Sequence, residues 1–271
     1  MLTGWIDTHC HLDAAEFDTD RNAISERARQ QGVSHIVIPA VERNNFDTVR
    51  TIAHATPGAV YALGIHPMYV QQAADEDLQH LETRLEQHIN DPKLVAVGEI
   101  GLDGFVPGLD MDKQQRFFRR QLQLAKQFDL PVIMHVRKAQ DLVLKHLRHN
   151  APCSGIAHAF NGSLQQADAF IELNCCLGFG GALTFERALQ IRRLLTTVST
   201  EAIVLETDSP DIAPHWLYRQ RNEPGELPRI AHVAAELLGW TPEQLMERSG
   251  QNACRALPRL NAHHAGIYRA D

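Results

Sequence analysis

Residues 5–13 read Trp-Ile-Asp-Thr-His-Cys-His-Leu-Asp, an apolar start that passes at once into histidines and acids. We predict a strand over Trp5–His11. Because successive side chains of a strand point to opposite faces, His9 and His11 point the same way and Cys10 points to the other side. Neutral imidazole is a common ligand of zinc and other divalent metals. A strand that ends in two parallel imidazoles therefore predicts half of a metal site.

Short apolar runs of this kind alternate with longer amphipathic segments from residue 5 to residue 210. Ile36–Ile38 and Ile203–Leu205 are apolar throughout, which is typical of parallel strands buried on both faces. The pattern predicts eight strands, over Trp5–His11, His35–Pro39, Val60–Gly64, Leu94–Glu99, Pro131–Val136, Gly155–Phe160, Cys175–Gly180 and Ala202–Asp208. Eight is the number of strands in a closed (β/α)8 barrel, the TIM barrel.

The amphipathic segments predict helices, among them Arg21–Gln31, Asp112–Phe128 and Leu164–Leu173. After the last strand, an irregular proline-rich stretch leads to two more helices, over Glu226–Leu238 and Pro242–Leu257. No linker or repeat marks a second domain, so we expect a single barrel domain over residues 1–271 with extra C-terminal helices. An open doubly wound sheet is disfavoured, because no G-x-G-x-x-G follows the first strand.

Composition narrows the class of protein. No stretch approaches the roughly 20 apolar residues of a membrane span, and no signal segment precedes the first strand. Five cysteines without C-x-x-C spacing suit a reducing compartment, so we expect a cytoplasmic protein. A net charge of −7 does not suit a protein that coats a nucleic-acid duplex by neutralising its phosphates. If the protein binds phosphates, the positive charge that attracts them must come from a few local groups, such as metal ions or arginines.

Metal-competent side chains recur at or near the C-terminal ends of the predicted strands, and in a barrel these ends converge on one mouth. They are His9, His11, Glu99, His135, His158 and Asp208. Six such ligands are enough for two metal ions, with a carboxylate such as Glu99 bridging both and a shared water between them. Each residue alone also fits a hydrogen-bonded core position, but burying all six without a cation would be costly.

The ordered motifs resemble those of the TatD family of metal-dependent hydrolases, a branch of the amidohydrolase-like TIM barrels. They run from about residue 5 to residue 224 and are Asp7–Asp13, Gly64–Pro67, Gly98–Asp103, Pro131–Arg137, His158 with Phe160–Gly162, Leu205–Pro210 and Arg221–Pro224. Agreement at so many spaced positions is far more specific than H-x-H alone. The residues Gly104–Gly108, Val136 and Lys138 depart from the common family pattern and put the substrate-contacting rim in question.

The resemblance implies two divalent ions, typically zinc, magnesium or manganese. The first would be held by His9, His11, Glu99 and Asp208, and the second by Glu99, His135 and His158. Asp208 and Glu99 are the predicted catalytic residues, because Asp208 can also accept a proton from the attacking water while Glu99 bridges. Glu206 and Asp7 are expected to support the ligands from deeper positions rather than to bind metal.

Four residues are predicted to contact substrate. His66 matches the family's G-x-H-P histidine and could reach a phosphate, or it could anchor its loop. Arg137 could pair with a phosphate through both guanidinium nitrogens, or form a surface ion pair. Arg221 and Glu223 match family residues that border the active site.

The leading hypothesis is a two-metal hydrolase of phosphodiester or phosphomonoester bonds, with a small phosphoester or the end of a single-stranded DNA as substrate. An alternative is an amidohydrolase that cleaves a C–N or lactone bond, but related enzymes of that kind often bridge their metals with a modified lysine, where this chain has Glu99. A third reading is a non-enzymatic barrel with structural metal. It is disfavoured because structural zinc sites are closed by four protein ligands, whereas this set of ligands leaves room for water on each ion.

Overall fold

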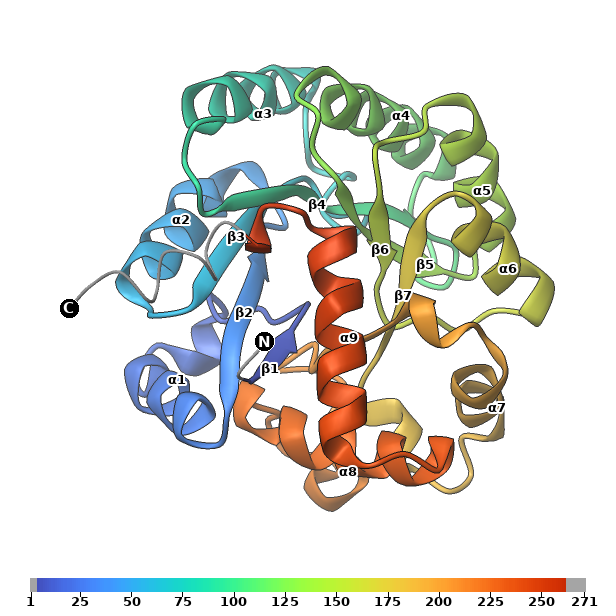
Figure 1. Cartoon of the computed structure of the whole chain (residues 1–271). Helices are drawn as coiled ribbons and strands as arrows, with labels where there is room; N and C mark the ends of the chain where they lie inside the picture. Colours follow the sequence, from blue (N-terminus) through green and yellow to red (C-terminus); the bar gives the residue numbers. More distant parts are fainter. Residues whose placement is uncertain (1–3, 262–271) are drawn as a thin grey trace.

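The computed structural model describes residues 4–261, which form a barrel of parallel strands surrounded by helices (Figure 1). Neighbouring strands pair in the order of the sequence. The strands are β1 (Trp5–Asp7), β2 (Val33–Pro39), β3 (Ala59–Leu63), β4 (Leu94–Asp103), β5 (Val132–Arg137), β6 (Gly155–Ala157), β7 (Cys175–Phe179) and β8 (Ile203–Leu205). The prediction of a (β/α)8 barrel is confirmed.

Each strand is followed by one helix of the outer ring (Figure 1). These helices are α1 (Arg21–Gln30), α2 (Phe46–Ala55), α3 (Asp75–His88), α4 (Met111–Gln127), α5 (Gln140–His149), α6 (Leu164–Glu172), α7 (Leu189–Thr197) and α8 (Leu227–Leu238). One more helix, α9 (Pro242–Ala256), follows. Of the two helices predicted as C-terminal additions, α8 therefore completes the ring and α9 alone is extra within the described residues.

The seam between the first and last strands closes the barrel. The amide of Thr8 donates to the carbonyl of Leu205 at 3.1 Å, and the amide of Asp208 donates to the carbonyl of His9 at 2.8 Å. Cys10 and Ser209 form an isolated parallel bridge just beyond. The seam thus brings the first histidine motif and the last acidic motif of the sequence side by side.

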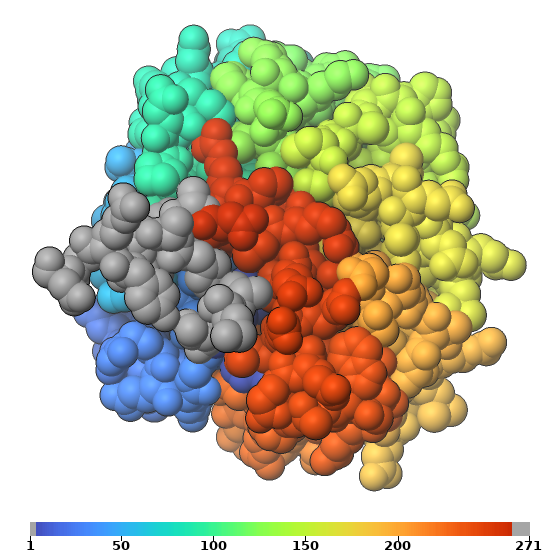
Figure 2. All heavy atoms as spheres, in the orientation of Figure 1, coloured from blue at the N-terminus to red at the C-terminus, as the bar shows by residue number. Residues whose placement is uncertain are grey.

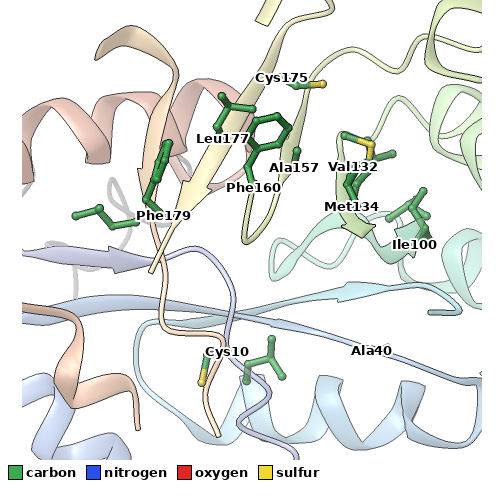
Figure 3. Packing of buried hydrophobic residues seen from close by; sticks show 14 of the residues in the cluster. Cys10, Ala40, Ile100, Val132, Met134, Ala157, Phe160, Cys175, Leu177 and Phe179 are labelled. Atoms are coloured by element: carbon green, nitrogen blue, oxygen red, sulfur yellow. The ribbon is translucent and has the colours of Figure 1, made fainter. Parts of the chain in front are cut away.

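Two apolar cores lie on either side of the strands. The larger fills the space between the strands and the ring of helices, where Phe160 packs edge to face against Phe170 of α6, with ring centroids 5.5 Å apart. Figure 3 shows part of this cluster, including Phe160 together with Leu177 and Phe179 of β7. Buried aromatic pairs of this geometry contribute packing energy beyond the area that they remove from water.

The smaller core closes one end of the barrel. It joins the inward residues near the strand starts to α9 and comprises Ile6, Val37, Val60, Ala62, Val95, Ala96, Ile133, Ile156, Cys176, Val204, Ala253, Cys254, Ala256, Leu257 and Leu260. In Figures 1 and 2 α9 lies across the centre of the end that faces the reader. The polar ends of the strands therefore open on the opposite face.

Three predicted strands end at least three residues earlier than expected, and in each a side-chain carboxylate accepts from an amide just beyond the end. β1 ends at Asp7, β6 at Ala157 and β8 at Leu205. Beyond these points bonds to carboxylates interrupt the pairing, since the amides of His9 and Thr207 both donate to Asp7 Oδ1 while the amide of Thr8 still donates to the carbonyl of Leu205. The expectation that His11 lies within the first strand was wrong for this reason.

β4 runs four residues past its predicted end at Glu99, because it stays paired with β5 as far as Asp103 opposite Arg137. Gly101 makes this possible. Its φ is +146°, and a Cβ there would lie 2.0 Å from the carbonyl oxygen of His135. Only glycine tolerates both the conformation and the contact. No helix among residues 4–261 is long and apolar enough to cross a membrane.

Candidate metal centre

Glu99, buried on β4, lies at the centre of a polar cluster at the open end of the barrel. Its Oε2 lies 3.1 Å from Nε2 of His9 and 3.4 Å from Nε2 of His11. The same two nitrogens lie 3.4 and 3.7 Å from Oδ1 of Asp208. Two imidazoles that follow β1, one carboxylate on β4 and one carboxylate that follows β8 are thus brought close together.

The other carboxylate oxygen of Glu99 faces a second group of histidines. Oε1 lies 2.8 Å from Nε2 of His158 and 3.2 Å from Nδ1 of His135. It also lies 3.2 Å from Nε2 of His66, whose loop follows β3. His66, predicted only as a substrate contact, is thus placed among the metal-competent side chains. The two oxygens of one carboxylate therefore point to two different sets of imidazoles.

The seam explains why His9 and His11 converge although they lie beyond β1. Asp7, fully buried, accepts from the amide of His9 and from both the amide and the hydroxyl of Thr207. Cys10 points the other way, with its Sγ 3.1 Å from the hydroxyl oxygen of Ser209. The alternation of side chains predicted from the sequence is therefore kept, and the two Nε2 atoms lie 3.2 Å apart.

Asp103 is a functional candidate that sequence reasoning quoted in a motif without giving it a role. Its Oδ2 lies 2.9 Å from Nε2 of His135, while its Oδ1 accepts from the amides of Phe105 and Val106. A carboxylate on the far nitrogen of a ligating histidine fixes the ring's orientation and tautomer. The signal was available, because Asp103 lies four residues after Glu99 and β4 could be extended to it.

Glu206, the residue directly after β8, lies beneath the cluster at the supporting position expected for it. Its Oε1 accepts from the amide of Ala159 and lies 3.9 Å from Nδ1 of His158. Room for the carboxyl group is left by Gly178 of β7, where a Cβ would lie 2.1 Å from Glu206 Oε2. Burial raises the pKa of Glu206 to about 8.

The buried charges of the cluster act strongly on one another. Burial alone would raise the pKa of Glu99, but the neighbouring histidines, His66 and His158 foremost, hold it well below its usual value. Burial opposes the protonation of His158, yet the charge of Glu99 outweighs it and raises the pKa of His158 to about 10. The carboxylate is thus held ionised, and cationic partners are favoured around it.

His9 and Asp208 show the opposite balance. Burial and then the charge of His158 hold the pKa of His9 well below its usual value. Burial raises the pKa of Asp208, which His158 and His11 only partly offset. The neutral imidazole of His9 has the protonation state that a metal ligand needs, whereas a cation bound beside Asp208 would offset the effect of burial and favour its carboxylate form.

The donor set fits divalent metal ions. Three groups have donor atoms that all lie within 4.8 Å of one another, namely His9–His11–Glu99, His9–His158–Asp208 and His66–Glu99–His135. Mixed imidazole and carboxylate donors suit zinc and manganese, and carboxylates also suit magnesium. The Nε2 atoms of His9 and His11 lie 3.2 Å apart, and a cation bound to both would give these two nitrogens a shared partner. All six predicted ligands therefore lie in one cluster, joined by His66.

Two of the predicted substrate contacts are engaged elsewhere. Arg221 forms a two-pronged ion pair with Asp20, with N–O distances of 2.9 and 2.6 Å, and also donates to the carbonyl of Glu16. Glu223 accepts from Arg27 of α1 at 2.7 Å. Both side chains thus tie the loop after β8 to the first βα unit. This arrangement favours a structural role for Arg221 and Glu223.

Arg137, the remaining predicted contact, is exposed at the end of β5. Its guanidinium lies 3.9 Å from the ring centroid of Phe105, and Lys138 lies 4.7 Å from the same ring. Within residues 4–261 no carboxylate forms an ion pair with Arg137, so the alternative of a surface ion pair is not realised there. The departure from the family pattern at Gly104–Gly108 thus builds a cationic, aromatic patch on the rim.

Comparisons with known proteins identify the family and the fold. The family model for TatD related DNase matches residues 6–258. The chain is 40% identical over 238 residues to the Escherichia coli K12 protein named uncharacterized metal-dependent hydrolase YjjV, covering 88% of this chain and 91% of that one. It is 31% identical to a Pantoea vagans protein named 3'-5' ssDNA/RNA exonuclease TatD, with 94% and 99% covered.

A solved structure shows the same architecture. The crystal structure of the Escherichia coli TatD homolog YJJV superposes with a TM-score of 0.91 at 37% identity, covering 95% of this chain and 99% of that chain. The resemblance inferred from the ordered motifs is thereby confirmed. With its barrel and its cluster of histidines and acids, the chain belongs to the TatD family of metal-dependent hydrolases.

Proposed function

We propose that this protein hydrolyses phosphodiester bonds of single-stranded nucleic acid with two divalent metal ions held at Glu99. The observation that carries the proposal is the placement of Glu99, whose Oε2 faces His9 and His11 while its Oε1 faces His66, His135 and His158. A carboxylate shared in this way is suited to bridge two ions. Asp208 would complete the ligands of the ion at His9 and His11. At the other ion, His66 would be a further ligand, or Asp103 would act indirectly by orienting His135.

Bound in this site, the ions would acidify a water molecule and polarise a phosphoryl oxygen. The chain's own groups then have separate tasks. Asp208, beside His9 and His11 at the edge of the cluster, accepts the proton that the attacking water loses, and burial supports this by raising the pKa of Asp208. Arg137 on the rim is available to orient a phosphate, since its guanidinium lies over the face of Phe105 and forms no ion pair within residues 4–261.

Two observations favour a phosphodiester over a C–N bond. The bridging position is occupied by Glu99 and not by a lysine, which disfavours the amidohydrolase alternative. A relative that matches nearly the whole chain is named a 3'-5' ssDNA/RNA exonuclease. The net charge of −7 restricts attraction for phosphates to local groups such as Arg137, which suits contact with a strand end better than coverage of a duplex.

The test uses protein stripped of metal and reloaded with Zn²⁺, Mn²⁺ or Mg²⁺. Each form is assayed on single-stranded DNA and RNA, a duplex, a chromogenic phosphodiester, a phosphomonoester, a dihydropyrimidine and a lactone. We expect cleavage of the single strands and of the phosphodiester. Asp208→Asn should lower kcat by about 10²–10⁴-fold, the range for loss of a general base. The control is Asp168→Asn, the same change on the exposed face of α6.

The outcome discriminates between the hypotheses. Turnover of the dihydropyrimidine or lactone with inert phosphoesters would establish the amidohydrolase alternative instead. Metal that is retained with no turnover of any substrate, and whose removal unfolds the protein, would indicate a structural role. An equal loss of activity in Asp168→Asn and Asp208→Asn would remove the assignment of Asp208 as proton acceptor.

A further inference from the structure

A cavity of about 730 Å³ opens beside the metal cluster, between the segments that follow β7 and β8. One wall is formed by Ala182, Phe185, Arg187 and Ala188, and the other by Pro210–Ala213 together with Tyr218–Gln220. Pro210 lies two residues after Asp208, and two residues of chain span at most about 7 Å. The volume falls in the range of about 300–1,000 Å³ that is usual for pockets that bind small organic groups.

The two walls are held by hydrogen bonds within each segment and by one bond between the segments, from His215 to Thr184. The hydroxyl of Thr184 donates to the carbonyl of Gly181 at 2.6 Å and accepts from the amide of His215 at 2.8 Å. Gly181 approaches the other wall so closely that a Cβ there would lie 2.1 Å from the carbonyl oxygen of Ile212. Buried Asn222 donates to the carbonyls of Asp211 and Thr207. The cavity is therefore preformed.

Two residues of the second wall have an unfavourable backbone conformation. Ile212 has a φ of +39° and Arg219 a φ of +64°, both in the left-handed region. For a β-branched residue such as isoleucine this is a strained conformation, and strain of this kind concentrates at binding sites. Asn222 holds this strained segment, since it also bonds to the carbonyl of Pro210 through its own amide.

The cavity combines aromatic faces with cations. The rings of Phe185 and Tyr218 meet edge to face, with centroids 6.0 Å apart, and Tyr218 is 53% exposed. Arg187 lies 5.7 Å from the ring of Phe185, and Arg219 lies 5.2 Å from the ring of Tyr218. Within residues 4–261 neither guanidinium has a carboxylate at ion-pair distance. These two cations are thus available to an anion from outside.

We propose that this cavity binds the nucleotide next to the bond that is cleaved, with its base against Tyr218 and Phe185 and its phosphate at Arg187 or Arg219. The proposal rests on the proposed phosphodiesterase function, because the cavity adjoins Asp208. Bases stack on aromatic rings whatever their sequence, and arginine adds attraction for both the π face and the phosphate. Aromatic rings interleaved with unpaired cations are typical of single-strand binding.

The uncharged and acidic polar groups of the cavity suit the base of a nucleotide better than they suit a phosphate. Asp211 and Gln220 line the same space, and an aspartate accepts from the amino group of a base but repels a phosphate. A bare inorganic phosphate would use the arginines and leave the rings exposed. A nucleotide satisfies the aromatic, cationic and acceptor groups together, which makes it the ligand class that the lining favours.

The experiment measures equilibrium binding, so that it does not depend on turnover. Wild-type holoenzyme loaded with Mn²⁺ is titrated with a fluorescent phosphorothioate trinucleotide that resists hydrolysis, and with the same trinucleotide lacking one base at its end. In the wild type, removal of the base should weaken binding by about 5- to 150-fold, which corresponds to the loss of one base stack. In Tyr218→Ala the two ligands should bind within about twofold of each other.

Further variants separate stacking from other effects. Tyr218→Phe keeps the ring and should retain the preference for the intact trinucleotide. Of Arg187→Ala and Arg219→Ala, the variant that removes the phosphate contact should lower the slope of log affinity against log salt by about 0.7, the value for one single-strand phosphate, and the other variant should leave the slope unchanged. The control is Arg193→Ala, an exposed position on α7 outside the cavity, which should bind both ligands like the wild type.

Two results would overturn the proposal. One is a wild type that binds the intact and the base-free trinucleotide equally well. The other is a Tyr218→Ala variant that loses the same factor in affinity for both ligands. If the holoenzyme cleaves no phosphodiester but still shows the base-dependent binding through Tyr218, the proposed function fails while the nucleotide subsite stands. The two proposals are thereby tested separately.

Discussion

The two ends of the barrel are built from the same strands and have opposite chemistry. At the closed end, Val95 of β4 and Ile133 of β5 join an apolar core that α9 covers. At the open end, a few residues further along the same strands, Glu99 and His135 form part of the polar cluster. By covering an apolar end and opening a polar one, this barrel places the groups that stabilise the fold apart from those that can bind metal.

The two ends also differ in how they affect the free energy of folding. Apolar burial at the closed end stabilises the fold without any ligand. At the open end, buried imidazoles and carboxylates oppose folding unless they are paired with one another or with a cation. Changes at the open end should therefore act on metal binding and activity, whereas changes at the closed end should act on stability.

The largest effect is expected for Glu99→Gln at the open end. Removal of the bridging charge leaves the histidines without their common anionic partner, so we expect hydrolysis to fall below detection and bound metal to fall below the wild-type content. Metal content is measured by elemental analysis and activity on the chromogenic phosphodiester. The matched control is Glu172→Gln at the exposed end of α6. Full metal content in Glu99→Gln would contradict a bridging role.

Leu257→Ala should have the converse effect at the closed end. Leu257 is fully buried in the core beneath α9, and its truncation should lower the free energy of unfolding by about 2–5 kcal/mol while kcat and metal content stay unchanged. Urea denaturation of the metal-free protein measures the difference. Leu189→Ala, at a position that is 74% exposed, should change stability by no more than about 0.5 kcal/mol. A loss of metal in Leu257→Ala would show that the two ends are coupled.

Asp103→Asn sharpens the comparison with a smaller effect at the open end. Asp103 contacts the far nitrogen of His135 and not the cluster itself, so its charge acts through that ring. We expect metal affinity to fall by about 10- to 100-fold, as for other carboxylates that orient a histidine ligand. Competition with a chelator of known affinity measures this change. Unaltered affinity would assign Asp103 to the turn at Phe105 and Val106 alone.

The sequence predicted the barrel and the cluster well because both depend on local patterns. Apolar runs such as Ile203–Leu205 mark buried strands, and the topology then brings all strand ends to one mouth. His9, Glu99 and Asp208 could be placed together on that basis alone. Their contacts across the seam follow from pairing the first strand with the last.

Other features depend on contacts that no local pattern contains. Whether Arg221 faces a substrate or Asp20 is decided by how the loop after β8 meets the start of α1. His66 joins the cluster because its loop folds over Glu99, which sequence spacing does not reveal. The role of α9 as a cover was likewise hidden, because an amphipathic helix fits the outer ring as well as the closed end.

The seam between β1 and β8 has a consequence for the order of folding. Asp7 and Thr207 are separated by 200 positions in the chain, yet their hydrogen bond sets the geometry of His9 and Asp208. A growing chain cannot complete the proposed metal centre until its last strand has been made and has closed the barrel. Metal capture would then be among the final events of folding. Because Asp208 would join His9 around an ion only in the closed barrel, a bound ion would stabilise the junction between the first and last strands against opening.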